Sequence, residues 1–328
     1  MRKLNYSLVI ASSVVLSCAA FLYSTPAAAQ DSGQAASAQA APAEAPPGSV
    51  PATRPPIPPG ERYPEGTSHI GNLTGHTNGQ DAGGDLYYRY CWGCHGARGD
   101  GNGENAPYVT PTPRNFVAAV FKCRSTPTGY LPTEEDIFDT LKRGIITSNM
   151  PSWATLSDQN RADLVAFIKT FSTRWETEKP GTPISIPPEP KVTLESIKHG
   201  KVLFTKLECW KCHGPQGRGD GPSASTLTDS NDQPIRPYNF YTGYRFKCGS
   251  TNRDLYKIFM TGVDGTPMPS FADVIKPEEA WDLVHYLRTL QIWHKSPELA
   301  LWESTPEGKA YVQSEKVMNV ETGSGIHP

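Results

Sequence analysis

This 328-residue chain has almost no excess of charge of either sign, since 31 Lys and Arg stand against 33 Asp and Glu, for a formal net charge of −2. It carries no basic stripe of the kind that neutralises phosphates, so we exclude nucleic acid as a partner. No Gly-Lys-Ser/Thr sequence accompanies its glycine-rich loops, which excludes a phosphate-binding loop. Methionine is also scarce, with five residues, so a thioether ligand has few candidate positions.

Cysteine occurs in an ordered pattern, because Cys-x-x-Cys-His appears twice, at 91–95 and at 209–213. This is the attachment signature of covalent haem c, in which two thiols bind the haem and the histidine binds its iron. A zinc site would need a second Cys-x-x-Cys or a histidine pair nearby, and a thioredoxin-like motif does not need the following histidine. We therefore predict two haem c groups, held by Cys91, Cys94, His95, Cys209, Cys212 and His213.

Two methionines are predicted to close the opposite face of each iron. Met150 lies in an Asn-Met-Pro-Ser-Trp segment and Met268 in a Pro-Met-Pro-Ser-Phe segment, and each follows its histidine, His95 or His213, by the same number of residues. A soft thioether opposite histidine favours Fe(II) and raises the reduction potential. The neighbouring prolines stiffen the chain and help to hold a weak ligand. The alternative is that both methionines fill the core.

The haem motifs belong to a longer internal repeat. Each copy starts with a helix-like segment in which a glycine precedes an aromatic residue by four positions. Each copy ends with apolar residues at helical spacing, for which Ser157 is a predicted N-cap and Pro277 a predicted first helical residue. The paired glycines and aromatics are Gly83 with Tyr87 and Gly200 with Phe204.

This order of helix, haem motif, methionine loop and helix resembles the class I cytochrome c fold. The pair of copies resembles diheme cytochromes c with two tandem class I domains, the c4-like arrangement. The resemblance implies an all-α chain in which each domain is a small helical bundle wrapped round a covalent haem c. It also offers Arg114 and Arg236 as partners of haem propionates, with solvated surface positions as the alternative.

Composition divides the chain into six segments. We predict a signal peptide at 1–29, an Ala/Pro-rich disordered tether at 30–62, cytochrome c domain 1 at 63–172, a Pro-rich linker at 173–192, cytochrome c domain 2 at 193–295 and a C-terminal tail at 296–328. The tail is polar, with one short helix expected around residues 307–317. The protein is thus expected in the periplasm or otherwise exported, either soluble or tethered to a membrane by an uncleaved N-terminal segment.

Two further cysteines, Cys123 and Cys248, occupy matching Phe-Lys-Cys contexts in the two copies. In an oxidising compartment such a pair favours a disulfide. Two buried free thiols are one alternative. A catalytic or haem-ligating cysteine, as in the thiosulfate dehydrogenases that this layout resembles, is another. The latter is disfavoured because both copies carry the same cysteine and a well-placed methionine.

Six histidines remain outside the haem motifs, and none occurs at matching positions in the two copies, so we assign them surface or packing roles. They are His69, His76, His199, His285, His294 and His327.

Together these features predict a diheme carrier that moves single electrons between a redox protein donor and a redox protein acceptor through two His/Met irons. An electron carrier is favoured over an enzyme. The alternatives are a cytochrome subunit of a larger respiratory or dehydrogenase complex and a haem enzyme of thiosulfate-dehydrogenase type. The sequence gives no indication of an oligomeric state.

Overall fold

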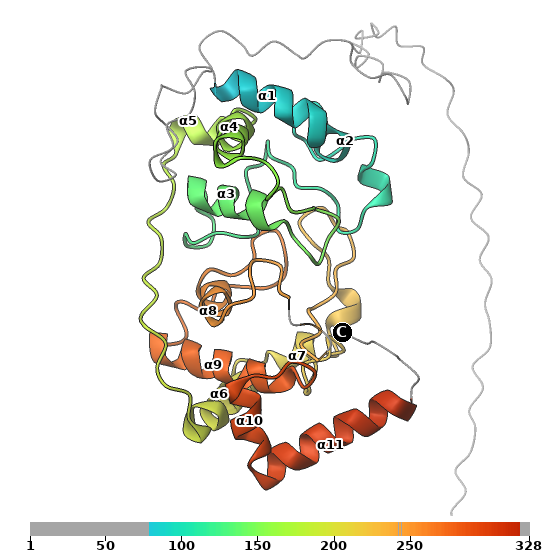
Figure 1. Cartoon of the computed structure of the whole chain (residues 1–328), viewed down its shortest axis with the longest axis vertical. Helices are drawn as coiled ribbons and strands as arrows, with labels where there is room; N and C mark the ends of the chain where they lie inside the picture. Colours follow the sequence, from blue (N-terminus) through green and yellow to red (C-terminus); the bar gives the residue numbers. More distant parts are fainter. Residues whose placement is uncertain (1–78, 242, 244, 322–328) are drawn as a thin grey trace, which may run out of the picture. The chain divides into compact units, whose positions relative to one another are not determined.

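The computed structural model describes residues 79–241, 243 and 245–321 (Figure 1). The predicted signal peptide and tether, and the first residues of domain 1, lie outside these residues. Within the described part the chain is all-α, with no strand and two isolated bridges. The helices of the first half are α1 (Gly79–Tyr90), α2 (Trp92–His95), the 3-10 turn η1 (Ala106–Tyr108), α3 (Glu134–Arg143), α4 (Asp158–Lys169) and α5 (Arg174–Thr177).

The second half repeats the order of the first five of these elements and then continues with two further helices. These elements are α6 (Leu194–Lys206), α7 (Trp210–His213), the 3-10 turn η2 (Ala224–Thr226), α8 (Asn252–Thr261), α9 (Pro277–Leu290), α10 (Pro297–Glu303) and α11 (Pro306–Glu321).

Helices α1 and α4 cross in close contact at Gly83 (Figure 1). A Cβ on Gly83 would lie 2.0 Å from the backbone oxygen of Asp163, so only glycine permits this approach. One turn later the fully buried Tyr87 packs against Phe167, with 5.2 Å between ring centroids. The predicted Gly–aromatic pair therefore forms the helix crossing that carries the first haem motif.

Helices α6 and α9 cross in the same way at Gly200. A Cβ on Gly200 would lie 2.0 Å from the oxygen of Asp282, and the rings of Phe204 and Tyr286 meet edge to face at 5.6 Å. Each crossing thus fixes the start of the haem motif that follows α1 or α6.

The helix starts are capped by side chains. Thr133 begins α3 and Thr251 begins α8 with capping boxes, in which the threonine hydroxyl accepts from the N3 amide and an aspartate at N3 accepts from the threonine amide. Ser157 caps α4 and Pro277 is the first residue of α9, which confirms both predictions.

The segment 173–192, predicted as a Pro-rich linker, contacts both halves. Trp175, in α5, is buried in the first core, and the Gly181 amide donates to the Leu131 carbonyl at 3.3 Å. Further on, Ile184 and Ile186 pack against the core of the second half. The few apolar residues between the prolines attach the segment to both halves.

The C-terminal tail forms two helices, α10 and α11, where a single short helix was expected. Trp302 of α10 is 3% exposed and belongs to the second core. Val312 of α11 packs with Tyr241, whose hydroxyl donates to the Glu315 carbonyl at 3.0 Å. Widely spaced apolar residues in a polar sequence were too weak a pattern to indicate this packing.

Candidate haem sites

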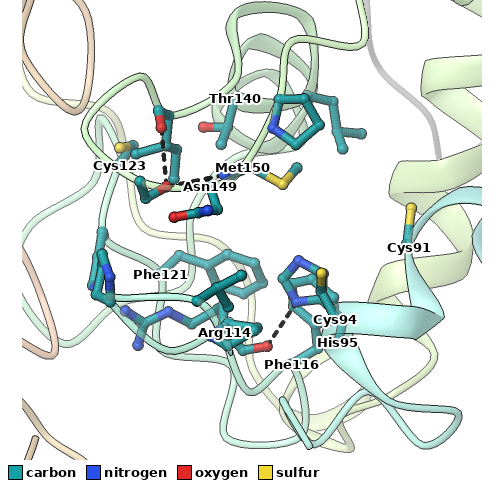
Figure 2. Close-up of a pocket in the computed structure, with 18 of the residues that line it drawn as sticks. Cys91, Cys94, His95, Arg114, Phe116, Phe121, Cys123, Thr140, Asn149 and Met150 are labelled. Carbon is teal, nitrogen blue, oxygen red and sulfur yellow. Dashed lines mark hydrogen bonds between the residues drawn. The ribbon is translucent and has the colours of Figure 1, made fainter. Parts of the chain in front are cut away.

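The predicted ligands of the first half project into a cavity of about 330 Å³ (Figure 2). Cys91, Cys94 and His95 line one wall, at the end of α1 and along α2. Met150 lies across the cavity and faces the imidazole. The sequence separates these residues widely, and the structure brings them together around one apolar space that fits a haem.

His95 is held in one orientation. Its Nδ1 lies 3.0 Å from the carbonyl oxygen of Arg114, and its ring stacks on Phe116 with centroids 4.5 Å apart. A bond from Nδ1 to a carbonyl fixes the tautomer that leaves Nε2 free to bind a metal. Burial lowers the pKa of His95, which keeps the imidazole in the neutral form that ligates iron.

Burial disfavours the thiolate form of the first cysteine in each motif. Burial, with a smaller contribution from Cys94, raises the pKa of Cys91 to about 12, and burial raises that of Cys209 to about 11. Zinc binding and disulfide exchange both need a thiolate at neutral pH. The environment of these thiols thus suits covalent attachment to an apolar group better than either alternative.

Met150 sits in a compact loop after α3. The Ile145 amide donates to the Met150 carbonyl at 3.0 Å, and the Met150 amide donates to the Ser148 hydroxyl at 3.2 Å. Gly144, at a positive φ of 70°, lets the backbone turn from the helix into this loop. These two hydrogen bonds and the turn at Gly144 therefore hold the backbone of Met150 in place.

One end of the cavity gathers three cations, Arg114, Lys122 and Lys247. Burial, and then the charges of Arg114 and Lys247, lower the pKa of Lys122 to about 7. Burial also lowers the pKa values of Arg114 and Lys247. Asp229 supplies a negative charge near all three, and the two propionates of a haem would add further negative charge in this poorly solvated space.

The second half repeats the histidine arrangement. His213 Nδ1 lies 3.0 Å from the Tyr238 carbonyl, and the His213 ring packs on Phe240 at 4.8 Å. Cys209 and Met268 both pack against the core cluster that contains Phe240. In the Met268 loop the Val263 amide donates to the Met268 carbonyl at 3.0 Å, as in the first half.

Arg236, offered with Arg114 as a propionate partner or a solvated surface residue, does not occupy the position in the second half that Arg114 occupies in the first. Arg236 is exposed, and Tyr238 supplies the carbonyl that Arg114 supplies in the first half. The common signal is Pro-x-Asn-Phe, which occurs at 113–116 and 237–240. Because the residue at x acts through its backbone, its side chain differs between the halves.

Cys123 and Cys248 form a disulfide with an S–S distance of 2.11 Å and a Cα–Cα distance of 5.1 Å. Next to it, the Arg124 side chain of the first half contacts Asp264 of the second. This arrangement places both sulfurs in a bond between the halves, away from any role as an iron ligand.

The spare histidines that the structure describes take part in packing or surface contacts. His285 is fully buried, and its Nδ1 lies 2.9 Å from the Ser196 hydroxyl. His199 Nδ1 lies 2.7 Å from a carboxylate oxygen of Asp282. Neither histidine lines the cavity of the first half.

Two family models match the chain. Residues 197–291 match cytochrome c, and residues 78–168 match cytochrome c oxidase, cbb3-type, subunit III. A solved chain of the Kuenenia stuttgartiensis reducing HAO-like protein complex Kustc0457/Kustc0458 is 41% identical, over 66% of this chain and 97% of that chain, with a TM-score of 0.62. No curated protein sequence matches the chain.

The fold and the site thus define a class of protein that holds haem c covalently and transfers electrons. The chain belongs to the cytochrome c family, and its two tandem domains are the arrangement of a diheme cytochrome c.

Two features are absent from the described part of the chain. None of the helices there combines the length and the apolar composition needed to cross a membrane. Nor do three or more His, Cys, Asp or Glu side chains gather there in a way that could hold a metal ion.

Proposed function

We propose that this protein is an exported electron carrier that moves single electrons through two haem c groups, each with one histidine and one methionine as axial ligands. The observation that carries the proposal is the cavity of the first half, where both motif cysteines and His95 face Met150. We assign Cys91, Cys94, Cys209 and Cys212 to covalent attachment. The axial ligands are His95, Met150, His213 and Met268.

The haem supplies an iron that cycles between Fe(III) and Fe(II). His95 with Met150, and His213 with Met268, would hold such an iron on both faces, so that it would exchange electrons without binding a substrate. The carbonyls of Arg114 and Tyr238 orient the two imidazoles. The buried aromatic residues around each site keep water away and so tune the potential. Arg114, Lys122 and Lys247 are suited to meet propionates at one end of the first cavity.

For the chain as a whole we propose the division into segments that its composition predicts. These are a signal peptide at 1–29, a tether at 30–62, domains at 63–172 and 193–295, a linker at 173–192 and the tail. Export fits haem attachment, which the family carries out outside the cytoplasm. The partners are a donor and an acceptor redox protein.

A second candidate is a dedicated cytochrome subunit of a larger redox complex. It is supported by the solved relative, which is a chain of a protein complex. Purification from native membranes distinguishes the two candidates, because a subunit co-purifies with a fixed partner in constant ratio and a free carrier does not.

The optical spectrum of the purified protein, ferric and ferrous, with and without carbon monoxide, tests the ligation. We expect a ferric Met–iron charge-transfer band for both haems and no response to carbon monoxide. Met150→Ala and Met268→Ala should each remove about half of the band, because one soft ligand is lost in each variant.

A ferrous spectrum of the wild-type protein that shifts with carbon monoxide would contradict the proposal. So would a band that neither methionine variant reduces. Either result would favour a haem enzyme with an exchangeable ligand.

A further inference from the structure

Two buried arginines hold the backbone next to the two methionines, and they do so from different places. Arg161 is 3% exposed and Arg124 is 1% exposed. Arg161 belongs to the same half as the methionine that it serves. Arg124 belongs to the opposite half.

Arg161, on α4, supports the segment that follows Met150. Its Nη1 donates to the carbonyl of Trp153 at 3.0 Å, to that of Ala154 at 3.3 Å, and to that of Leu156. These bonds collect carbonyls that a loop would otherwise leave without partners. The first methionine loop is therefore stabilised by its own domain.

The second half lacks this support at the same position. When α4 is aligned with α9, the residue in the place of Arg161 is Ala280, which is fully buried and has no polar side-chain atom. The position equivalent to Arg161 therefore donates no hydrogen bond to the Met268 loop.

Arg124 of the first half instead contacts the segment that precedes Met268. Its Nε donates to Asp264 Oδ2 at 2.8 Å and its Nη2 to the Thr261 carbonyl at 2.7 Å, while Nη2 also pairs with Asp264 Oδ1. The Gly129 amide donates to Asp264 Oδ2 at 3.1 Å. Asp264 lies in the loop from α8 to Met268, so these bonds join the first half to that loop.

The first methionine loop has no equivalent of the contact between Arg124 and Asp264. The aligned residue for Asp264 in the first methionine loop is Ile146, which is 52% exposed and has no charge to pair. Asp264 and Thr261 are themselves 140 and 137 positions from Arg124, so the bonds form only when the two halves dock.

We propose that Arg124 is a positioning residue for Met268, through which the first domain controls how firmly the second haem keeps its methionine ligand. The inference rests on the ligation proposed above. A methionine thioether is a weak iron ligand, so its retention depends on how rigidly its loop is held. Loss of Arg124 would also remove a buried partner from the Asp264 carboxylate, while the Thr261 carbonyl would keep the Thr128 hydroxyl, which donates to it at 2.9 Å.

Competition with imidazole in the ferric protein measures this control. In a Met150→Ala background the charge-transfer band reports the second haem alone, and in a Met268→Ala background it reports the first. Adding Arg124→Gln to the first background should lower the imidazole concentration at half-displacement by about tenfold or more. In the second background the midpoint should stay within roughly twofold.

Arg161→Gln is the matched control and should show the opposite pattern, with an effect on the first haem only. Asp264→Asn removes the loop's side of the contact and should reproduce the effect of Arg124→Gln. It also provides the test if Arg124→Gln does not fold. Reduction potentials of the two haems, measured in the same variants, should show the larger change at the second haem.

An unchanged imidazole midpoint at the second haem would overturn the inference, as would an equal fall at both haems. A failure of the ligation itself looks different, because Met268→Ala alone would then leave the whole band in place.

Discussion

At the scale of single residues, glycine decides how closely the helices of each domain approach. At Gly200 the space that a side chain would need is occupied by the backbone of α9, and at Gly83 by the backbone of α4. No rotamer change relieves a clash with backbone, so a larger residue must push the helices apart. Since α1 and α6 lead directly into the haem motifs, such a shift would also move the attachment cysteines.

Gly200→Ala should therefore lower the free energy of unfolding by about 3 kcal/mol, at the upper end of the usual effect of overpacking. The matched control is Val202→Ala on the same helix. Val202 is 59% exposed, so its change should stay within about 0.5 kcal/mol. Denaturant unfolding followed by haem absorbance gives both values, and equal effects would contradict the role of the crossing.

At the scale of elements, the two ends of α3 and of α8 determine where each methionine loop begins. Both helices start at a threonine whose hydroxyl accepts from the N3 amide, and both end at a glycine with positive φ, Gly144 or Gly262. The start and end of each helix are thus fixed by local bonds. The loop that holds the methionine leaves directly from the glycine.

Thr251→Ala should cost about 1 kcal/mol of stability, because it leaves the Asp254 amide without its cap. Thr251→Ser keeps the hydroxyl and should remain close to the wild-type protein. Thermal unfolding followed by circular dichroism compares the two variants. Equal melting temperatures for the alanine and serine variants would show that the hydroxyl does not stabilise the helix.

At the scale of the whole molecule, the halves are joined by more than the chain between them. The Cys123–Cys248 disulfide connects positions 125 residues apart, and the Arg124–Asp264 ion pair lies beside it. A crosslink over such a long loop restricts the unfolded chain strongly. It therefore contributes to the stability of the two domains as a docked pair.

Cys123→Ser with Cys248→Ser should lower the free energy of unfolding by about 2–5 kcal/mol. Urea unfolding followed by haem absorbance measures the change. Treating the wild-type protein with a thiol reductant should give the same midpoint, because thioether bonds to haem resist reduction. The double variant should not respond to the reductant, and a response would show that another bond was being broken.

The sequence alone located most of each candidate site. Two Cys-x-x-Cys-His motifs and two equally placed methionines name eight residues, and helix caps such as Ser157 follow from local patterns. These features are readable because haem attachment and helix initiation each depend on neighbouring residues in the chain. The same is true of Gly83, whose spacing from the next aromatic indicated a close crossing.

Only the tertiary structure decided which distant groups support those residues. Arg114 and Tyr238 contact the histidines through backbone carbonyls, so their side chains did not indicate that the two positions correspond. Arg124 meets Asp264 across 140 positions, and nothing in either local sequence marks the pair. A buried ion pair between two domains depends on the docking of both complete cores, which no short pattern encodes. The proposed ligands were thus named by the sequence, and the contact between Arg124 and Asp264 was decided by the fold.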